Sequence, residues 1–304
     1  MFSKRVAQVA AVVSAVALAA ACSSDDGSLS ASPETTKETT VPISAVTTSV
    51  VDAGAEPRSR MTFAPPPGAP QQVVMTSRSD IFQQIADQPQ QNLSTPEVTM
   101  PLTAVSSSPD PALSVELTLG AMTSSDSRLQ DSLASSEGSK AGLSIQPNGA
   151  ITALRITPAA DSEDIARSAI EQAFYQAVYR GIAFPDAEIG VGAVWTMQQQ
   201  VMSGMALRQV TTATLREVAG NRLTVDVSIT QEPEARVWHL PADAGTLNID
   251  TFVMSGSGTL VVDLEAPLPV DGSVTVGGEQ TYSDPNSTTR LRQATTNTVR
   301  WSGQ

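Results

Sequence analysis

The residue whose chemistry this sequence defines most narrowly is Cys22, the single cysteine of the 304-residue chain. It directly follows Ala19-Ala20-Ala21, whose small side chains suit the groove of a signal peptidase. Upstream, Lys4 and Arg5 precede an apolar run that extends from Val6 to Ala21. A cationic start, a short apolar core and a small-residue cleavage site predict a secretory signal over residues 1–21 rather than a membrane-spanning helix. Cleavage after Ala21 would place the Cys22 thiol at the new N-terminus, where it is available for acylation.

The stretch Leu18-Ala19-Ala20-Ala21-Cys22 resembles the lipobox of bacterial lipoproteins, in which the modified cysteine becomes residue one. It departs from the usual pattern at Ala19, where leucine is more common. The alternative is an ordinary signal peptide cut after an A-x-A site. The resemblance implies acyl chains such as palmitate on Cys22, which anchor the mature protein at the extracytoplasmic face of the cell membrane. Each buried CH₂ of such chains contributes about 0.8 kcal/mol, so more than one chain gives stable anchoring.

Residue counts exclude several common kinds of active site. With one cysteine there is neither an intramolecular disulfide nor a cysteine-based metal site. His239 is the only histidine, so a zinc site with two or three imidazoles cannot form. A Ser-His-Asp triad on His239 stays arithmetically possible, but its place beside Trp238 in a short apolar strand is more typical of a structural histidine. We therefore expect no enzyme activity, no cofactor and no metal, with a His239-dependent hydrolase as the remote alternative.

Three short motifs could carry chemistry but lack a required part. Gly190-Val191-Gly192 begins like a dinucleotide fingerprint, yet Trp195 stands where the third glycine belongs. Ser255-Gly256-Ser257-Gly258 lacks the first glycine of a nucleophile elbow. The acidic group Asp161, Glu163 and Asp164 matches no calcium-loop spacing, and a helix N-terminus explains it better.

The charge balance limits the partners. The chain has 18 Lys+Arg and 31 Asp+Glu, a net charge of -13. Removal of Lys4 and Arg5 leaves 16 basic residues against 31 acidic ones, or −15. This balance argues against nucleic acid and against electrostatic binding to an anionic membrane face. The lipid on Cys22 is therefore the expected membrane attachment.

Residues 22–96 are predicted to form a disordered linker that follows the lipidated cysteine. They are rich in Ser, Thr and Pro, as in Ala64-Pro65-Pro66-Pro67-Gly68, and poor in residues that can pack. Such a composition buries too little apolar surface to offset the ordering of the chain. The exception is Ser79–Ala86, where Ile81, Phe82 and Ile85 could form a helical turn or two.

Residues 97–304 have the pattern of an antiparallel β-rich domain. Leu113–Leu119 alternates apolar and polar residues, which is the period of a half-buried strand. Strands at 143–146 and 150–156 flank Pro147-Asn148-Gly149, a strong hairpin signal. After Gly190 we expect strands at 194–201, 207–215, 223–230, 235–240, 258–264, 273–282 and 289–301. Many neighbouring strands joined by short turns imply antiparallel pairing.

One amphipathic helix is predicted among these strands, from Ser162 to Arg180. Its apolar residues recur at helical spacing: Ile165, Ala169, Ile170, Ala173, Phe174, Ala177 and Val178. The opposite face is polar, so this helix should lie across the sheet. The predicted fold class is α+β: a curved antiparallel sheet, an open barrel or half-barrel, with one packed amphipathic helix after the linker.

The stretch Phe184-Pro185-Asp186-Ala187-Glu188-Ile189-Gly190-Val191-Gly192-Ala193-Val194-Trp195 resembles the signature of an uncharacterised family of actinobacterial secreted lipoproteins. The resemblance extends over about residues 98–301, and it implies an envelope lipoprotein of unknown function without catalytic residues. As architecture, the two glycines of this stretch permit tight backbone at the start of a strand, and Trp195 supplies a large apolar anchor. A ligand site is the alternative interpretation.

Two non-catalytic functions remain. In the first, helix and sheet enclose an apolar cavity for a lipid or glycolipid, against the alternative of a filled core. Methionine adapts to irregular apolar shapes, and the candidate lining residues are Phe174, Trp195, Met197, Met202, Met205 and Met254. In the second, the domain is a scaffold that binds another envelope protein through a sheet surface, such as the Thr-rich strands at 211–215 and 288–299. The sequence leaves the oligomeric state open.

Overall fold

A single antiparallel sheet contains the strands of the part of the chain that this computed structural model describes, residues 38–107, 112–240 and 244–303. Along the sheet the strands are ordered β1-β9-β8-β6-β5-β3-β16-β15-β14-β12-β11-β10-β2, while β13 pairs with β14, β4 with β3 and β7 with β5. The bounds are β1 (Thr39–Pro42), β2 (Thr47–Asp52), β3 (Pro70–Ile85), β4 (Gln91–Asn92), β5 (Thr95–Ser106), β6 (Leu113–Leu119), β7 (Thr123–Ser124), β8 (Lys140–Ile145), β9 (Ile151–Thr157), β10 (Val194–Met202), β11 (Ala206–Ala219), β12 (Arg222–Pro233), β13 (Val237–His239), β14 (Thr246–Asp263), β15 (Asp271–Ser283) and β16 (Arg290–Gly303).

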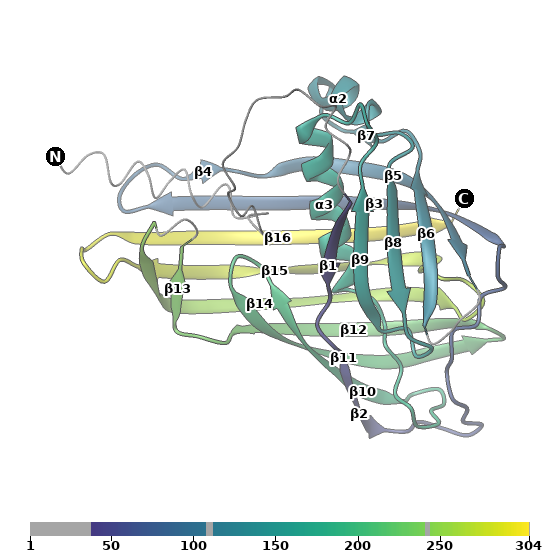
Figure 1. The fold of residues 1–304 in the computed structure, drawn as a ribbon. Coiled ribbons are helices and arrows are strands. Elements are labelled where there is room, and N and C mark those ends of the chain that lie inside the picture. Colours follow the sequence, from purple (N-terminus) through teal and green to yellow (C-terminus); the bar gives the residue numbers. More distant parts are fainter. Residues whose placement is uncertain (1–37, 108–111, 241–243, 304) are drawn as a thin grey trace, which may run out of the picture.

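The helix α3 (Asp164–Val178) lies between two parts of this sheet (Figure 1). The sheet bends so that β6, β8 and β9 stand in front of the long strands, with α3 between the two parts. Side chains of α3 and of both parts belong to one buried apolar cluster. The buried residues of α3 are Ala166, Ile170, Ala173, Phe174, Ala177 and Val178. Within the described ranges, no helix has the length and apolar character needed to cross a membrane.

Two short helical elements, η1 (Ser127–Leu129) and α2 (Gln130–Ala134), precede β8 and fix the start of α3. The backbone N–H of Glu163 donates to Ser135 Oγ at 3.1 Å, and Ser132 Oγ donates to the Glu163 carboxylate at 2.7 Å. The acidic group predicted at a helix start lies there: Glu163 is the N-cap residue of α3 and Asp164 is in its first turn, but the Glu163 side chain forms no capping hydrogen bond. Its Glu163 carboxylate is held by a serine.

The antiparallel β-rich character predicted from the sequence is confirmed, as are most of its elements beyond residue 97. β6 has the predicted bounds, and β8 and β9 form the hairpin about Pro147-Asn148-Gly149. α3 lies within the predicted range 162–180. The predicted strands after Gly190 correspond to β10–β16, although β14 begins at Thr246 rather than at residue 258.

The predicted linker over residues 22–96 is wrong for residues 38–96. This part of the chain forms β1 to β4 and the start of β5. Ser79–Ala86, predicted as a helical turn, lies almost wholly in β3, which pairs with β16 on one side and β5 on the other. β3 is polar because its outward positions face water and several of its inward positions carry Ser or Gln. The signal peptide and Cys22 lie outside the described residues.

One continuous stretch of chain occupies both edges of the sheet. β1 pairs with β9 at one edge, and β2 pairs with β10 at the other. Between them, the N–H of Ile43 donates to Thr152 O at 3.1 Å. Backbone groups at an exposed edge otherwise lack protein partners. Residues 39–52 therefore supply hydrogen-bond partners to β9 and to β10, which would otherwise be the two edge strands.

The next residues of this stretch run against the loop before β10. The N–H of Ala55 donates to Val191 O at 2.8 Å, and the N–H of Gly190 donates to Ala53 O at 2.9 Å. A Cβ on Gly190 would lie 1.9 Å from the carbonyl oxygen of Ala55. Gly54, at φ +76, would place a Cβ 2.5 Å from Gly190 O. These glycines permit a backbone approach that no side chain would allow.

Gly190→Ala is expected to lower the free energy of unfolding by about 1–3 kcal/mol, because the added methyl group must push residues 53–57 away from the loop. Urea denaturation followed by circular dichroism would measure it. Gly181→Ala is the matched control, since its added Cβ would meet Ile151 Cδ1 at an ordinary 3.7 Å. Equal urea midpoints for the two variants would contradict the role of the close approach.

Candidate functional site

An apolar cavity of about 50 Å³ lies between α3 and the strands that face it. Its walls include Phe174 and Val178 of α3, Leu117 of β6, Leu143 of β8 and Trp301 of β16. Pockets that bind small molecules usually measure about 300–1,000 Å³, so this cavity has room for a few atoms. An acyl chain would enter it only if α3 or a neighbouring loop moved.

Of the six candidate lining residues, Phe174 lines this cavity and the other five lie elsewhere. Trp195 is fully buried and donates from Nε1 to Ala183 O at 3.0 Å. Met197 is buried and its sulfur accepts from the N–H of Ala183, whereas Met254 accepts from Gln280. Met202 is 48% exposed. Met205 is half-buried against both apolar clusters of the sheet.

Polar side chains cross the inner face of the sheet beside α3. On β10, β11 and β12, Gln199 is opposite Gln209, which is opposite Gln231. On β3, β16 and β15, Gln83 is opposite Gln293, which is opposite Gln280. With their neighbours they form what we call the polar belt: Ser79, Gln83, Gln199, Gln209, Gln231, Gln280, Gln293, Thr295 and Asn297.

One half of the polar belt is tied to the end of α3. Gln209 Nε2 donates to Tyr179 O at 2.8 Å, and Gln199 Nε2 donates to the same oxygen at 3.3 Å. Gln231 Nε2 in turn donates to Gln209 Oε1 at 2.8 Å. The last turn of a helix leaves carbonyl groups without helical partners. These glutamines supply donors there.

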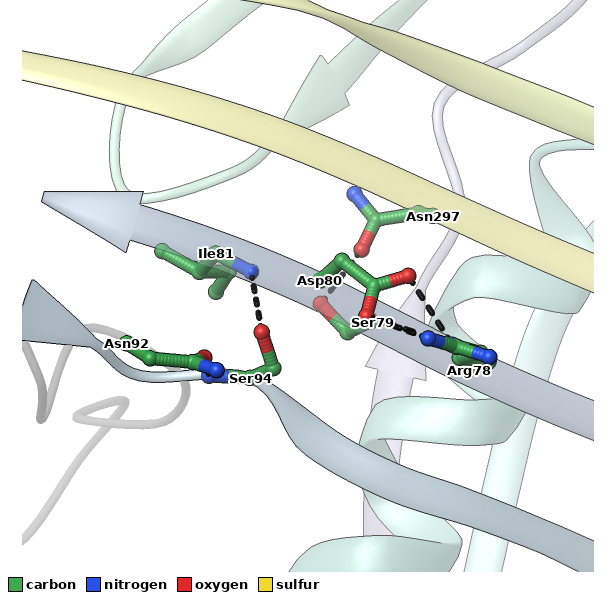
Figure 2. Close-up of polar contacts among 7 residues, drawn as sticks. All are labelled: Arg78, Ser79, Asp80, Ile81, Asn92, Ser94 and Asn297. Atoms are coloured by element: carbon green, nitrogen blue, oxygen red, sulfur yellow. Dashed lines mark hydrogen bonds and ion pairs between the residues drawn. The ribbon is translucent and has the colours of Figure 1, made fainter.

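Ser79 and Asn297 connect β3 to β16 inside the sheet (Figure 2). Ser79 Oγ donates to Asn297 Oδ1 at 2.6 Å, and Gln176 of α3 contacts the same oxygen at 3.4 Å. Figure 2 also shows Arg78 against Asp80, with the guanidinium 2.9 Å from the carboxylate. Because side chains alternate along a strand, this exposed ion pair lies on the face opposite Ser79.

Two other members of the polar belt have buried side-chain atoms without a hydrogen-bond partner among the described residues. Gln83 is 1% exposed, and both its amide oxygen and its amide nitrogen are unpaired among the described residues. Gln280 is 4% exposed with an unpaired Oε1. A buried polar atom without a partner costs about 1–3 kcal/mol. Each such atom in a folded protein calls for an explanation, for which a water molecule or an ion is one choice.

On β3, β15 and β16 the polar belt separates two apolar clusters, whereas on β10 and β11 Val201 and Leu207 beyond the belt still belong to the larger one. The larger one surrounds α3 and its cavity. The smaller one, at the far end of the long strands, consists of Ile85, Trp238, Leu240, Leu247, Tyr282 and Leu291. Its aromatic rings, Trp238 and Tyr282, have centroids 5.3 Å apart, and burial raises the pKa of Tyr282. The inner face is therefore apolar, then polar, then apolar along β3, β15 and β16.

The residues predicted as remote catalytic candidates do not form a constellation. His239 is exposed on β13 and has no hydrogen bond to a carboxylate or hydroxyl among the described residues, whereas its neighbour Trp238 is buried. No group of three or more His, Cys, Asp or Glu side chains in the described ranges could hold a metal ion. The Ser255–Gly258 stretch lies in the middle of β14 rather than at a strand-to-helix turn.

No protein-family model matches the chain, and a search of curated proteins finds no match for it. The resemblance of Phe184–Trp195 to actinobacterial secreted lipoproteins therefore stays a prediction. In the structure this stretch is a packing junction: the rings of Phe184 and Trp195 are fully buried with centroids 5.6 Å apart. Together with the close approach at Gly190, this favours the architectural interpretation of the stretch.

Gln83→Met is expected to raise the free energy of unfolding by about 1 kcal/mol, because a similar volume is kept while two unpaired polar atoms leave the interior. The matched control is Gln209→Met, which should lower it by about 1–3 kcal/mol because Tyr179 O and Gln231 Nε2 lose a partner. Urea denaturation of both variants would test this. If the two substitutions were equally destabilising, Gln83 would be fully bonded in solution.

Proposed function

We propose that this protein is an extracytoplasmic lipoprotein, anchored in the cell membrane through Cys22, whose domain binds a lipid or glycolipid and catalyses no reaction. In this proposal the sheet is a curved open half-barrel and α3 is its packed amphipathic helix. The observation that carries it is the inner face of the sheet, where an apolar cavity beneath α3 adjoins the polar belt. An amphiphile presents the same sequence of apolar and polar parts.

A lipid chain can bind beneath α3 only if the helix moves away from the sheet, since the cavity measures about 50 Å³. The buried face of α3 supports this, because Ala166, Ala173 and Ala177 contribute little apolar area. Its large anchors are Ile170, Phe174 and Val178, each worth about 1.5–3 kcal/mol of burial. An acyl chain that took the place of these side chains would restore similar apolar contacts with the sheet. The apolar burial lost when a ligand displaces α3 is thus offset by the apolar burial that the acyl chain gains.

The acidic charge of the chain is consistent with this role at a membrane. With 16 basic residues against 31 acidic ones once Lys4 and Arg5 are removed, the protein is repelled by anionic lipid headgroups. The anchor on Cys22 would hold the domain near the membrane while repulsion keeps it off the surface. Ligand exchange then depends on the concave side of the sheet and not on adsorption.

Cys22→Ser is expected to move the protein from the membrane fraction to the soluble fraction of lysed cells, because the thiol that accepts the acyl chains is gone. Fractionation followed by immunoblotting would measure the distribution. Ser23→Ala, at the next position, is the matched control and should remain with the membrane. A Cys22→Ser protein that stayed in the membrane fraction would rule out the anchor.

Ala177→Phe is expected to reduce co-purified lipid at least fivefold, because the new ring occupies the cavity wall where a chain would enter. Native mass spectrometry of protein extracted from membranes would measure the bound lipid. Ala169→Phe is the control: it lies on the same helix, is half-buried, and does not line the cavity. A wild-type protein without any bound lipid would refute the carrier proposal.

A second candidate function, a scaffold that binds another envelope protein, is favoured by exposed valines at the β2 edge. Val51 of β2 is 68% exposed and Val191 is 46% exposed. The two residues lie on segments that are joined by the hydrogen bond from Ala55 N to Val191 O. Apolar side chains at an edge strand suit a partner that adds a strand. Crosslinking in intact cells without a recovered partner would count against this function.

A further inference from the structure

Arg180, two residues beyond the end of α3, is a buried cation without a counter-charge. The residue is 9% exposed, and its Nη1 atom is buried with no hydrogen-bond partner in residues 38–107, 112–240 and 244–303. Its guanidinium takes part in none of the ion pairs formed by the described residues. Burial lowers the pKa of Arg180 to about 10, so the side chain still carries its positive charge at neutral pH.

The surrounding contacts place Arg180 at the polar belt. The carbonyl of the preceding residue, Tyr179, accepts hydrogen bonds from Gln209 and Gln199. Gln176, in the last turn of α3, contacts Asn297 of the polar belt at 3.4 Å. The N–H of Arg180 donates to Ala177 O at 3.0 Å, so Arg180 closes a turn directly after the helix. Both contacts put one side of the end of α3 against the polar belt, whereas Val178 of the same turn lines the apolar cavity.

The neighbourhood of Arg180 offers hydrogen-bond donors and no negative charge. Each amide nitrogen of Gln199, Gln209 and Gln231 has two N–H groups, of which the hydrogen bonds within the polar belt use one. Desolvation is the sole cause of the lowered pKa of Arg180, with no contribution from a carboxylate. Spare N–H donors and an uncompensated guanidinium thus occur at the same end of α3, and both kinds of group suit an anion.

The state of Arg180 is costly for an arginine with a purely structural role. An isolated charge in the interior is costly, and buried charges in proteins are paired or hydrogen-bonded. A methionine would fill a similar volume at the end of α3 without that cost. The energetic penalty at Arg180 is therefore explained if a ligand supplies the missing charge.

We infer that Arg180 and the neighbouring amides of the polar belt bind an anionic ligand group, a phosphate or a carboxylate. The planar guanidinium matches both groups with two parallel hydrogen bonds, and the spare amide N–H groups complete the contacts. The anion has two sources: the headgroup of an amphiphile whose chains lie beneath α3, or a small free anion. The first source rests on the proposed function, and the second does not.

Isothermal titration calorimetry on the full mature chain, with Cys22→Ser in every protein so that no detergent is needed, tests this inference. The probes are inorganic phosphate, hexanoate, dihexanoyl phosphatidic acid and the uncharged dihexanoylglycerol. Arg180→Met should weaken binding of the anionic probes at least tenfold. Arg292→Met, which removes an exposed arginine of β16 and changes the net charge equally, should change it less than twofold.

The pattern across probes identifies the source. Arg180-dependent binding of phosphatidic acid alone assigns a lipid headgroup. Arg180-dependent binding of phosphate or hexanoate without phosphatidic acid assigns a free anion, and the lipid proposal then fails while this site stands. Binding that is equally tight in Arg180→Met, or no binding of any anionic probe, overturns the inference.

Thermal unfolding distinguishes a loss of anion binding from a loss of folding in Arg180→Met. Without ligand, Arg180→Met should melt at a higher temperature than the parent protein, because an unpaired buried charge has been removed. A saturating anionic probe should raise the melting temperature of the parent and leave that of the variant unchanged. A variant that melts well below the parent would show that Arg180 is structural, and the inference would be wrong.

Discussion

The hydrogen bonds that residues 39–59 form with both edges of the sheet are the constraint on which the enclosed space depends. β1 completes β9 and β2 completes β10, and residues 53–59 then run against the loop before β10. Backbone N–H and C=O groups must find partners when they are buried. With this segment in place, the bent sheet keeps its two edges at a fixed separation, and α3 is retained between its facing parts. The cavity and the polar belt both follow from that geometry.

The sequence indicated those parts of the fold whose residues face an apolar core. β6 alternates cleanly because Leu113, Val115, Leu117 and Leu119 are all buried and the residues between them are not. α3 could be predicted from the sequence because its apolar stripe packs on the sheet over its whole length. In both cases, burial of one face makes apolar residues recur with the period of a strand or of a helix, which can be recognised in the sequence.

β3 was missed for the opposite reason. Its inward positions run from Val73 and Met75 to Ser77, Ser79 and Gln83, with Ile81 and Ile85 between and after the polar ones, so polar residues interrupt the apolar phase. Its pairing with β16 joins residues that are more than 200 positions apart, as the bond between Ser79 and Asn297 shows. No local pattern encodes such pairing. A strand that carries a polar site on its inner face therefore has the composition of a linker.

The candidate site was predictable in part from strand phase. Trp195 fixes the odd positions of β10 as inward, so Met197 and Gln199 face the interior while Met202 faces water. The same phase marks Gln209 on β11 and Gln231 on β12 as inward amides. Methionine content suggested a cavity, whereas the phase of the glutamines was the stronger signal. What no phase reveals is the absence of a partner for Arg180, since that depends on which side chains the whole sheet brings to the end of α3.

The start of the sheet also changes how far the domain can reach under the proposed anchoring. A linker that ended at residue 96 would allow the domain to stand about 260 Å from a lipid on Cys22, at the extended limit of 3.3–3.6 Å per residue. Because β1 begins at Thr39, the chain between Cys22 and the sheet spans at most about 60 Å. That segment leads directly into an edge strand that is bonded to β9. Under the proposed anchoring, a domain on so short a tether would work next to the membrane surface, where an exchanged ligand would cross only a narrow layer of water.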